Sequence, residues 1–109
     1  RLLTLQTAYE HMNRGDHALE RGAVEAALAE YGQAEQLVPD NMEMKFWHAV
    51  SLANAGRVDA ALPLFASIFR QDTRWRELVP RLAAAGLLGV DKNIIERIVN
   101  SGIQPGGDQ

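Results

Sequence analysis

The fold is indicated by a heptapeptide that occurs twice, first as Gly22-Ala23-Val24-Glu25-Ala26-Ala27-Leu28 and then as Gly56-Arg57-Val58-Asp59-Ala60-Ala61-Leu62. The two copies lie 34 residues apart, and five of their seven positions are identical. The correspondence continues with Tyr31 in the first copy and Phe65 in the second. A fixed period of this length is typical of helical repeat proteins, so we expect two copies of one supersecondary unit.

Each copy predicts a glycine turn followed by a helix. Glycine adopts the left-handed backbone conformation at a helix end without a Cβ penalty, so Gly22 and Gly56 are expected to end one helix and to form the turn. After each glycine, apolar residues return at the spacing of one stripe on an amphipathic helix. These residues are Val24, Ala27, Leu28, Tyr31, Ala34 and Leu37 in the first copy, and Val58, Ala61, Leu62, Phe65, Ile68 and Phe69 in the second.

The segments that precede the two glycines are expected to be helical as well. Gly15 interrupts the first of these helices without ending it, because a small residue there permits close packing. Asp40 or Asn41 can cap the start of the helix before Gly56. Pro63 falls inside the helix that follows Gly56, where it removes one hydrogen bond and is expected to bend the helix.

The unit of two helices resembles the tetratricopeptide repeat. The family's characteristic positions fall on Gly15, Gly22, Ala27, Tyr31, Ala34 and Pro39 in a first repeat at about 8–41. They fall on Ala49, Gly56, Ala61, Phe65, Ile68 and Thr73 in a second repeat at about 42–75. The first copy has His11 where the family usually has an aromatic residue, and Ile68 and Thr73 depart from its alanine and proline. The resemblance implies an all-α fold in which two helix-turn-helix repeats stack as right-handed helical hairpins.

Two further helices are expected after the repeats. Residues 74–86 predict one helix, or two short ones that meet at Pro80, and Asp91 can cap a last helix over 91–100. A stacked repeat array exposes apolar surface at its open end, so these helices are expected to cover it. We therefore expect a single domain over residues 1–100, with 101–109 as a disordered tail.

The composition narrows the classes of function. The chain has 109 residues, 47% of them hydrophobic and 23% charged, which is typical of one globular domain. The net charge of −3 is too small to indicate a nucleic-acid partner, and without cysteine there is neither a disulfide nor a thiolate metal site. No apolar run approaches the roughly 18 residues of a membrane span, so no membrane partner is expected. The cellular compartment stays open.

No motif in the chain indicates catalysis, a metal or a cofactor. His11 and His17 are six residues apart, so they do not share a helix face, and His48 has no metal-ligand spacing to either. Acidic residues such as Asp16 and Glu20 are expected on the helix surface, where ion pairs are weak. We expect a domain that is not an enzyme by itself and that needs no cofactor.

A helical repeat array usually binds its partner on the concave face, which the first helix of each unit lines. That face is expected to hold an apolar floor with acidic edges, which suits a basic or amphipathic segment. The candidate residues are Tyr9, Met12, Asp16, Glu20, Glu43, Phe46, Val50 and Asn54. This predicts an interaction or scaffolding module that binds a peptide, a partner domain or a second copy of the chain.

The chain also resembles the C-terminal region of a family of bacterial and archaeal proteins that begin with an Ntn-hydrolase-like domain. Three stretches carry this resemblance: 8–16, Phe46-Trp47-His48-Ala49, and Trp75-Arg76-Glu77-Leu78 with 84–88. It implies an alternative function, a peptidoglycan-binding accessory domain, with catalysis in the preceding domain. It agrees with a start at Arg1 rather than Met. Trp47 and Trp75 would then be glycan contacts; the alternative is that each packs between helices.

Overall fold

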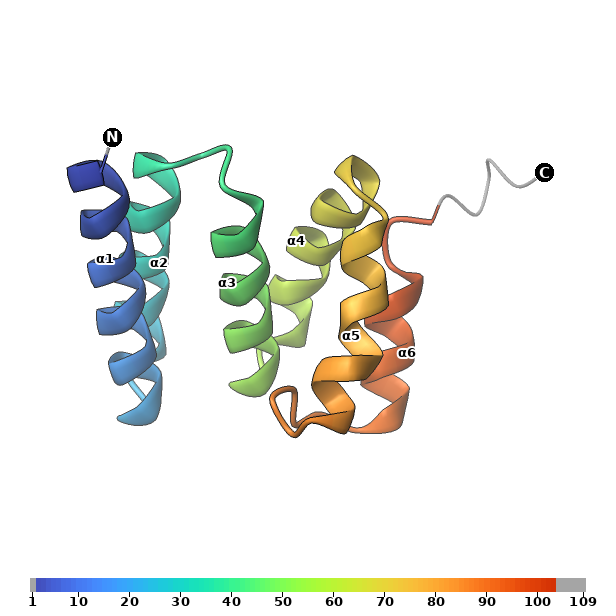
Figure 1. Cartoon of the computed structure of the whole chain (residues 1–109). Coiled ribbons are helices and arrows are strands. Elements are labelled where there is room, and N and C mark those ends of the chain that lie inside the picture. The colour runs from blue at the N-terminus through green and yellow to red at the C-terminus, as the bar shows by residue number, and fades with distance from the viewer. Residues whose placement is uncertain (1, 104–109) are drawn as a thin grey trace. The chain divides into compact units, whose positions relative to one another are not determined.

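The computed structural model describes residues 2–103, and all regular structure within them is helical (Figure 1). Six helices follow one another in this part of the chain, and it contains no strand. They are α1 (Leu2–Glu20), α2 (Val24–Leu37), α3 (Met42–Asn54), α4 (Val58–Gln71), α5 (Arg74–Ala84) and α6 (Lys92–Asn100). The predicted all-α class is therefore confirmed.

The chain divides into two compact units, Arg1–Ser51 and Leu52–Gln109. The first contains α1, α2 and most of α3, and the second contains the end of α3 with α4, α5 and α6. The prediction of one domain over residues 1–100, with its right-handed stack, stays a prediction. The two units are described separately below.

A glycine in the left-handed conformation ends three of the helices. Gly22, Gly56 and Gly86 have φ angles of 78°, 83° and 81°, which is the left-handed region. In the first case the Gly22 N–H donates to the Leu19 carbonyl and the Ala23 N–H to the Ala18 carbonyl, at 2.9 and 2.8 Å. These two bonds define a Schellman motif, and both recur at the other two glycines. The turns predicted from the repeat are thus confirmed.

In the first unit, α1 and α2 lie side by side as a helical hairpin (Figure 1). Small residues let the two helices approach closely. At Gly15 the approach is so close that an added Cβ atom would lie 2.5 Å from Cε1 of Tyr31. α1 continues through Gly15, as predicted. The amide N–H of Met44 donates to the Asn41 side chain at 2.9 Å, so Asn41 caps α3. The core consists of Ala8, Met12, Ala18, Ala27, Tyr31, Ala34 and Met44.

In the second unit, α6 contacts both α4 and α5. α4 runs unbroken through Pro63, and α5 is one helix through Pro80 rather than two. The Asp91 side chain accepts the Ile94 N–H at 2.9 Å and caps α6, as expected. The side chain of Asn54 donates to the Leu87 carbonyl at 3.0 Å and accepts the Gly89 N–H at 2.8 Å, which fixes the turn after α5.

The end of α6 is held by the guanidinium group of Arg76. Its Nε donates to the Val99 carbonyl at 2.7 Å and its NH2 group to the Ser101 carbonyl at 3.0 Å. The same guanidinium lies over the Phe69 ring, 4.9 Å from its centre. The tail was expected to start at residue 101, but residues 101–103 belong to this unit; residues 104–109 lie outside the described part.

Candidate functional site

The apolar members of the predicted concave face lie inside the protein. Met12, Phe46 and Val50 are 6%, 0% and 3% exposed. Met12 belongs to the core of the first unit. These three side chains have almost no surface to offer a partner, so the apolar floor expected from the sequence is interior instead. The spacing placed them on the inward side of their helices but could not say whether that side faces a groove or a core.

The remaining members of that face reach solvent: Tyr9, Asp16, Glu20, Glu43 and Asn54. Tyr9 is 40% exposed, so its ring can contact a partner. Asn54 uses both ends of its amide on the turn after α5 and has a structural role. The members of the predicted face that remain accessible in the first unit are therefore one aromatic side chain, Tyr9, and three carboxylates, those of Asp16, Glu20 and Glu43.

A layer of polar side chains joins the three helices of the first unit. The Tyr31 hydroxyl donates to Oδ1 of Asp16 at 2.6 Å, and the Ser51 hydroxyl donates to the same oxygen at 3.3 Å. The ring of His48 lies 4.6 Å from the ring of Tyr31, and Nδ1 of His48 is hydrogen-bonded to Oε2 of Glu35. Burial, and then the bond to Asp16, raise the pKa of the Tyr31 phenol well above its usual range.

His48 is the most constrained member of this layer. It is 8% exposed, and it is the one buried polar residue among those described. Its Nε2 is buried and has no hydrogen-bond partner among them. Neither His48 nor Glu35 was predicted from the sequence to be a site residue. A comparison of the two copies at the 34-residue offset would have flagged Glu35, because its counterpart in the second copy is Phe69.

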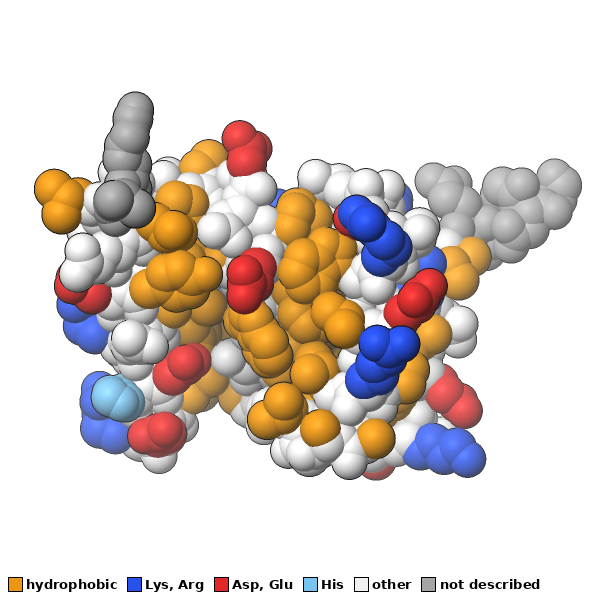
Figure 2. Space-filling view, in the orientation of Figure 1, with side chains coloured by type: hydrophobic (Ala, Val, Ile, Leu, Met, Phe, Trp, Pro, Cys, Tyr) orange, Lys and Arg blue, Asp and Glu red, His pale blue; other side chains and the backbone are white. Residues whose placement is uncertain are grey.

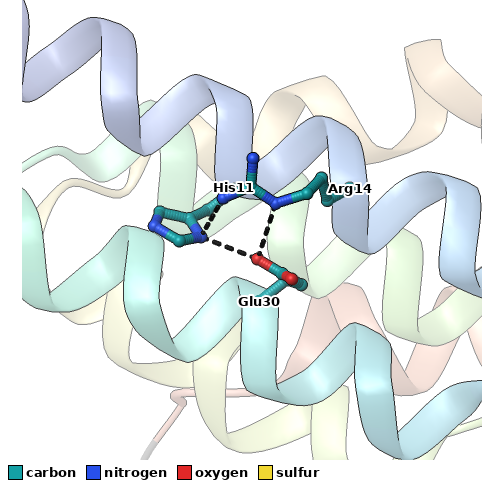
Figure 3. A network of polar contacts seen from close by, with 3 residues as sticks. All are labelled: His11, Arg14 and Glu30. Carbon is teal, nitrogen blue, oxygen red and sulfur yellow. Dashed lines mark hydrogen bonds and ion pairs between the residues drawn. The ribbon is translucent and has the colours of Figure 1, made fainter.

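A second polar network joins the outer faces of α1 and α2 (Figure 3). Oε1 of Glu30 lies 2.7 Å from Nδ1 of His11 and 3.3 Å from Nε of Arg14, and Arg14 NH2 lies 2.8 Å from the same histidine nitrogen. That nitrogen can donate to Glu30 or accept from Arg14, but not both at once. The pKa of Glu30 lies below its usual range, chiefly because of the bond to His11; burial opposes this, and Arg14 adds to it.

Next to this network, α1 and α2 form a small hollow of about 230 Å³. Arg14, His17 and Arg21 line it together with Glu30. Figure 2 shows basic, histidine and acidic side chains mixed at the C-terminal end of α1, at the lower left. Because Glu30 already lies between the cationic groups, the local charge is mixed rather than strongly basic, and it singles out no ligand.

The two tryptophans proposed as glycan contacts differ in their surroundings. Trp47 is 37% exposed and meets Phe46 edge-on, with 5.7 Å between ring centres. Trp75 is partly buried and lines an open hollow of about 320 Å³ with Asp72, Arg74 and Leu78. Arg74 donates to both carboxylate oxygens of Asp72, at 3.0 and 2.8 Å. These bonds hold the pKa of Asp72 below its usual range.

No group of three histidine or acidic side chains in residues 2–103 is placed to hold a metal ion. In the same range, no helix combines the length and the apolar content needed to cross a membrane. Comparison with known proteins gives no match to any family model, to any curated protein or to any solved structure.

Proposed function

We propose that this chain is a non-catalytic interaction module of the tetratricopeptide kind, which binds a peptide segment of a partner protein. The supporting observation is that two pairs of core residues 34 positions apart have the same environment. Ala27 and Ala61 are both fully buried, and so are Tyr31 and Phe65. The two turn glycines share one conformation and one hydrogen-bond pattern. Repeats of this kind serve most often as binding scaffolds.

The surface that favours a peptide lies on the first unit. Asp16, Glu20 and Glu43 are exposed there, and Tyr9 adds an aromatic ring. Carboxylates beside an aromatic ring suit a basic segment, because a lysine or arginine can pair with the acids and stack on the ring. A partner domain or a second copy of the chain could supply such a segment in place of a separate protein.

A displayed library of random peptides tests this proposal. The immobilised domain should enrich peptides with a shared, basic pattern, and a synthetic peptide of that pattern should bind in solution by calorimetry. Sedimentation velocity of the domain alone would show whether a second copy is the partner. The proposal fails if the library yields no enriched pattern over an unrelated helical domain and the chain sediments as a monomer at high concentration.

A second candidate function is binding of a glycan such as peptidoglycan, as part of a larger Ntn-hydrolase-like protein. The observation that favours it is the hollow at the start of α5, where Trp75 lies next to the bonded pair of Asp72 and Arg74. An aromatic face beside fixed polar groups suits a sugar ring, which has one apolar face and hydroxyls at its edge.

Sedimentation of the domain with purified peptidoglycan separates this candidate from the first. Trp75→Ala should abolish co-sedimentation, whereas Trp47→Ala, a change at the other tryptophan, should leave it intact. Absence of the wild-type domain from the pellet would exclude glycan binding. Equal loss in both variants would exclude the α5 hollow as the site.

A further inference from the structure

A polar hollow of about 390 Å³ lies where α2 ends and α3 begins, within the first unit. Gly32, Glu35, Gln36, Pro39 and Lys45 line it. A Cβ atom added at Gly32 would meet nothing within 4 Å, so the backbone at that point borders open space. The hollow is distinct from the exposed acidic side chains discussed above, and neither of the two family resemblances assigns it a role.

The carboxylate of Glu35 is fixed by a hydrogen bond to the side chain of His48. Oε2 is hydrogen-bonded to Nδ1 of His48, whose ring is buried and lies against Tyr31. Oε1 makes no hydrogen bond to any side chain or backbone group in residues 2–103. A carboxylate with one oxygen bonded to a buried, fixed ring has little rotational freedom to lose when its other oxygen accepts a bond from a ligand.

Lys45 lines the same hollow on the α3 side, yet no ion pair joins it to Glu35 in the described part of the chain. The Glu35 carboxylate can accept a hydrogen bond and the Lys45 ammonium group can donate one, so the hollow offers a ligand both an acceptor and a donor. A main-chain amide matches this pair chemically, because it offers one N–H to the acceptor and one carbonyl to the donor. An isolated cation or anion fits less well, since either one would meet a like charge.

The junction between α4 and α5, which lies 34 residues after the junction between α2 and α3, shows that a helix junction of this kind does not require the polar arrangement. At the 34-residue offset Glu35 corresponds to Phe69, Lys45 to Val79 and His48 to Leu82. Phe69 and Val79 are both 0% exposed, so the second unit has packed apolar side chains at these positions. A buried histidine with an unpartnered nitrogen costs stability that an apolar residue would not, which argues for a functional reason to keep it.

We propose that this hollow binds one main-chain amide of an extended peptide, with Glu35 accepting its N–H and Lys45 donating to its carbonyl. The inference rests on the proposed function and specifies a contact that serves it. His48 is a positioning residue that acts through Glu35. Because the contact is to the main chain, it supports binding of many peptide sequences, and the exposed acids elsewhere on the unit supply the preference for a basic one.

The probe is a blocked triglycine, acetyl-Gly-Gly-Gly-N-methylamide, which offers amides and no side chains. Titrated into the ¹⁵N-labelled domain, it should shift the signals of Gly32, Gln36 and Lys45 in a saturable way, with a dissociation constant on the order of millimolar. Lys45→Met should weaken binding by about ten-fold. Lys92→Met removes the chain's other lysine and should change nothing.

His48→Leu introduces the residue type found 34 positions later in α5, Leu82, and tests the positioning role. Its circular dichroism should stay helical while triglycine affinity falls by several fold. Unchanged affinity in this folded variant would refute the role given to His48. Sodium acetate and methylammonium chloride, titrated separately at matched ionic strength, serve as single-charge probes. If either saturates the hollow as tightly as the triglycine, the site is an ion site and the amide proposal is wrong.

This inference and the proposed function can fail separately. If the peptide library yields a binder but triglycine shifts no signal in the hollow, the inference is overturned and the interaction module stands. If neither binds, both are overturned. If triglycine binds as described and the library peptides compete with it, both are supported.

Discussion

Replacing Gly15 by alanine should destabilise the protein, although alanine is the better helix former. In a helix interior the change would ordinarily stabilise by about 1 kcal/mol. Here the new Cβ would lie 2.5, 2.8 and 3.0 Å from three ring atoms of Tyr31. The ring cannot easily withdraw, because it is fully buried and its hydroxyl is bonded to Asp16 at 2.6 Å.

The magnitude follows from the opposing effects. Overpacking a core costs about 1–3 kcal/mol, and displacing the ring would also weaken a hydrogen bond to a charged group worth about 1.5–3 kcal/mol. Against a helix gain of about 1 kcal/mol, we expect a net loss of about 2 kcal/mol. For a domain of this size, that corresponds to a fall in Tm of roughly 10 °C.

Urea denaturation followed by circular dichroism measures this loss, and Gly32→Ala is the matched control. Gly32 lies inside α2, and a Cβ there meets nothing within 4 Å, so this variant should gain about 0.5–1 kcal/mol. Tyr31→Phe combined with Gly15→Ala reproduces the residues of the second copy, Phe65 and Ala49. The freed ring should recover about 1 kcal/mol as coupling energy. If Gly15→Ala stabilised as much as Gly32→Ala, the close packing described here would be wrong.

Three other predictions concern side chains whose contacts lie within a single unit. Arg76→Met keeps the aliphatic stem but removes two hydrogen bonds to the end of α6 and the contact over Phe69. It should lower the free energy of unfolding by about 2–4 kcal/mol and speed amide hydrogen exchange in α6. Unchanged exchange in α6 would contradict the anchoring role of Arg76. Carboxyl NMR should show Glu30 titrating below the usual pH for glutamate, and His11→Ala should raise that midpoint because the bond to His11 is the main cause of the lowered pKa. The stability that Glu30 contributes is present above the ordinary glutamate pKa and declines as pH falls through the lowered pKa of the folded state. If His11→Ala left the titration midpoint of Glu30 unchanged, His11 would not be the cause of the lowered pKa. Because the folded-state pKa of Tyr31 is raised, its contribution to stability is present below about pH 10, the pKa of an unfolded tyrosine, and is lost as pH rises above it. Tyr31→Phe should therefore flatten the alkaline stability curve, and absorbance at 295 nm should show the Tyr31 phenol ionising only with unfolding.

The repeat allowed most of the helix pattern to be predicted, because its strongest signals are local. Gly22 and Gly56 end helices through backbone geometry that few other residues adopt, and their role needs no knowledge of distant contacts. Asp91 caps α6 for the same reason, since a cap depends only on the next turn of chain. Gly15 was also interpretable, because its place in the repeat indicates a close approach between neighbouring helices.

The candidate site was harder to predict, because burial depends on residues far away in the sequence. Met12 and Phe46 have the spacing of an inward helix face, and that spacing is the same for a core and for a groove. The contact of His48 with Glu35 joins positions 13 residues apart, and no local rule pairs them. The polar hollow appears in the sequence only as a mismatch between copies, such as Glu35 against Phe69.

The anchoring of α6 by Arg76 has a consequence for the order of folding. α6 has nine residues, which is too few for a stable helix in water, where about 12–15 are needed even for favourable sequences. The carbonyls of Val99 in its last turn and of its C-cap, Ser101, accept hydrogen bonds from a side chain of α5, 23 and 25 residues earlier in the chain. α6 should therefore stay a fluctuating coil until α5 has formed, both as the chain emerges during synthesis and during refolding, and it should be the first helix of its unit to be lost on unfolding.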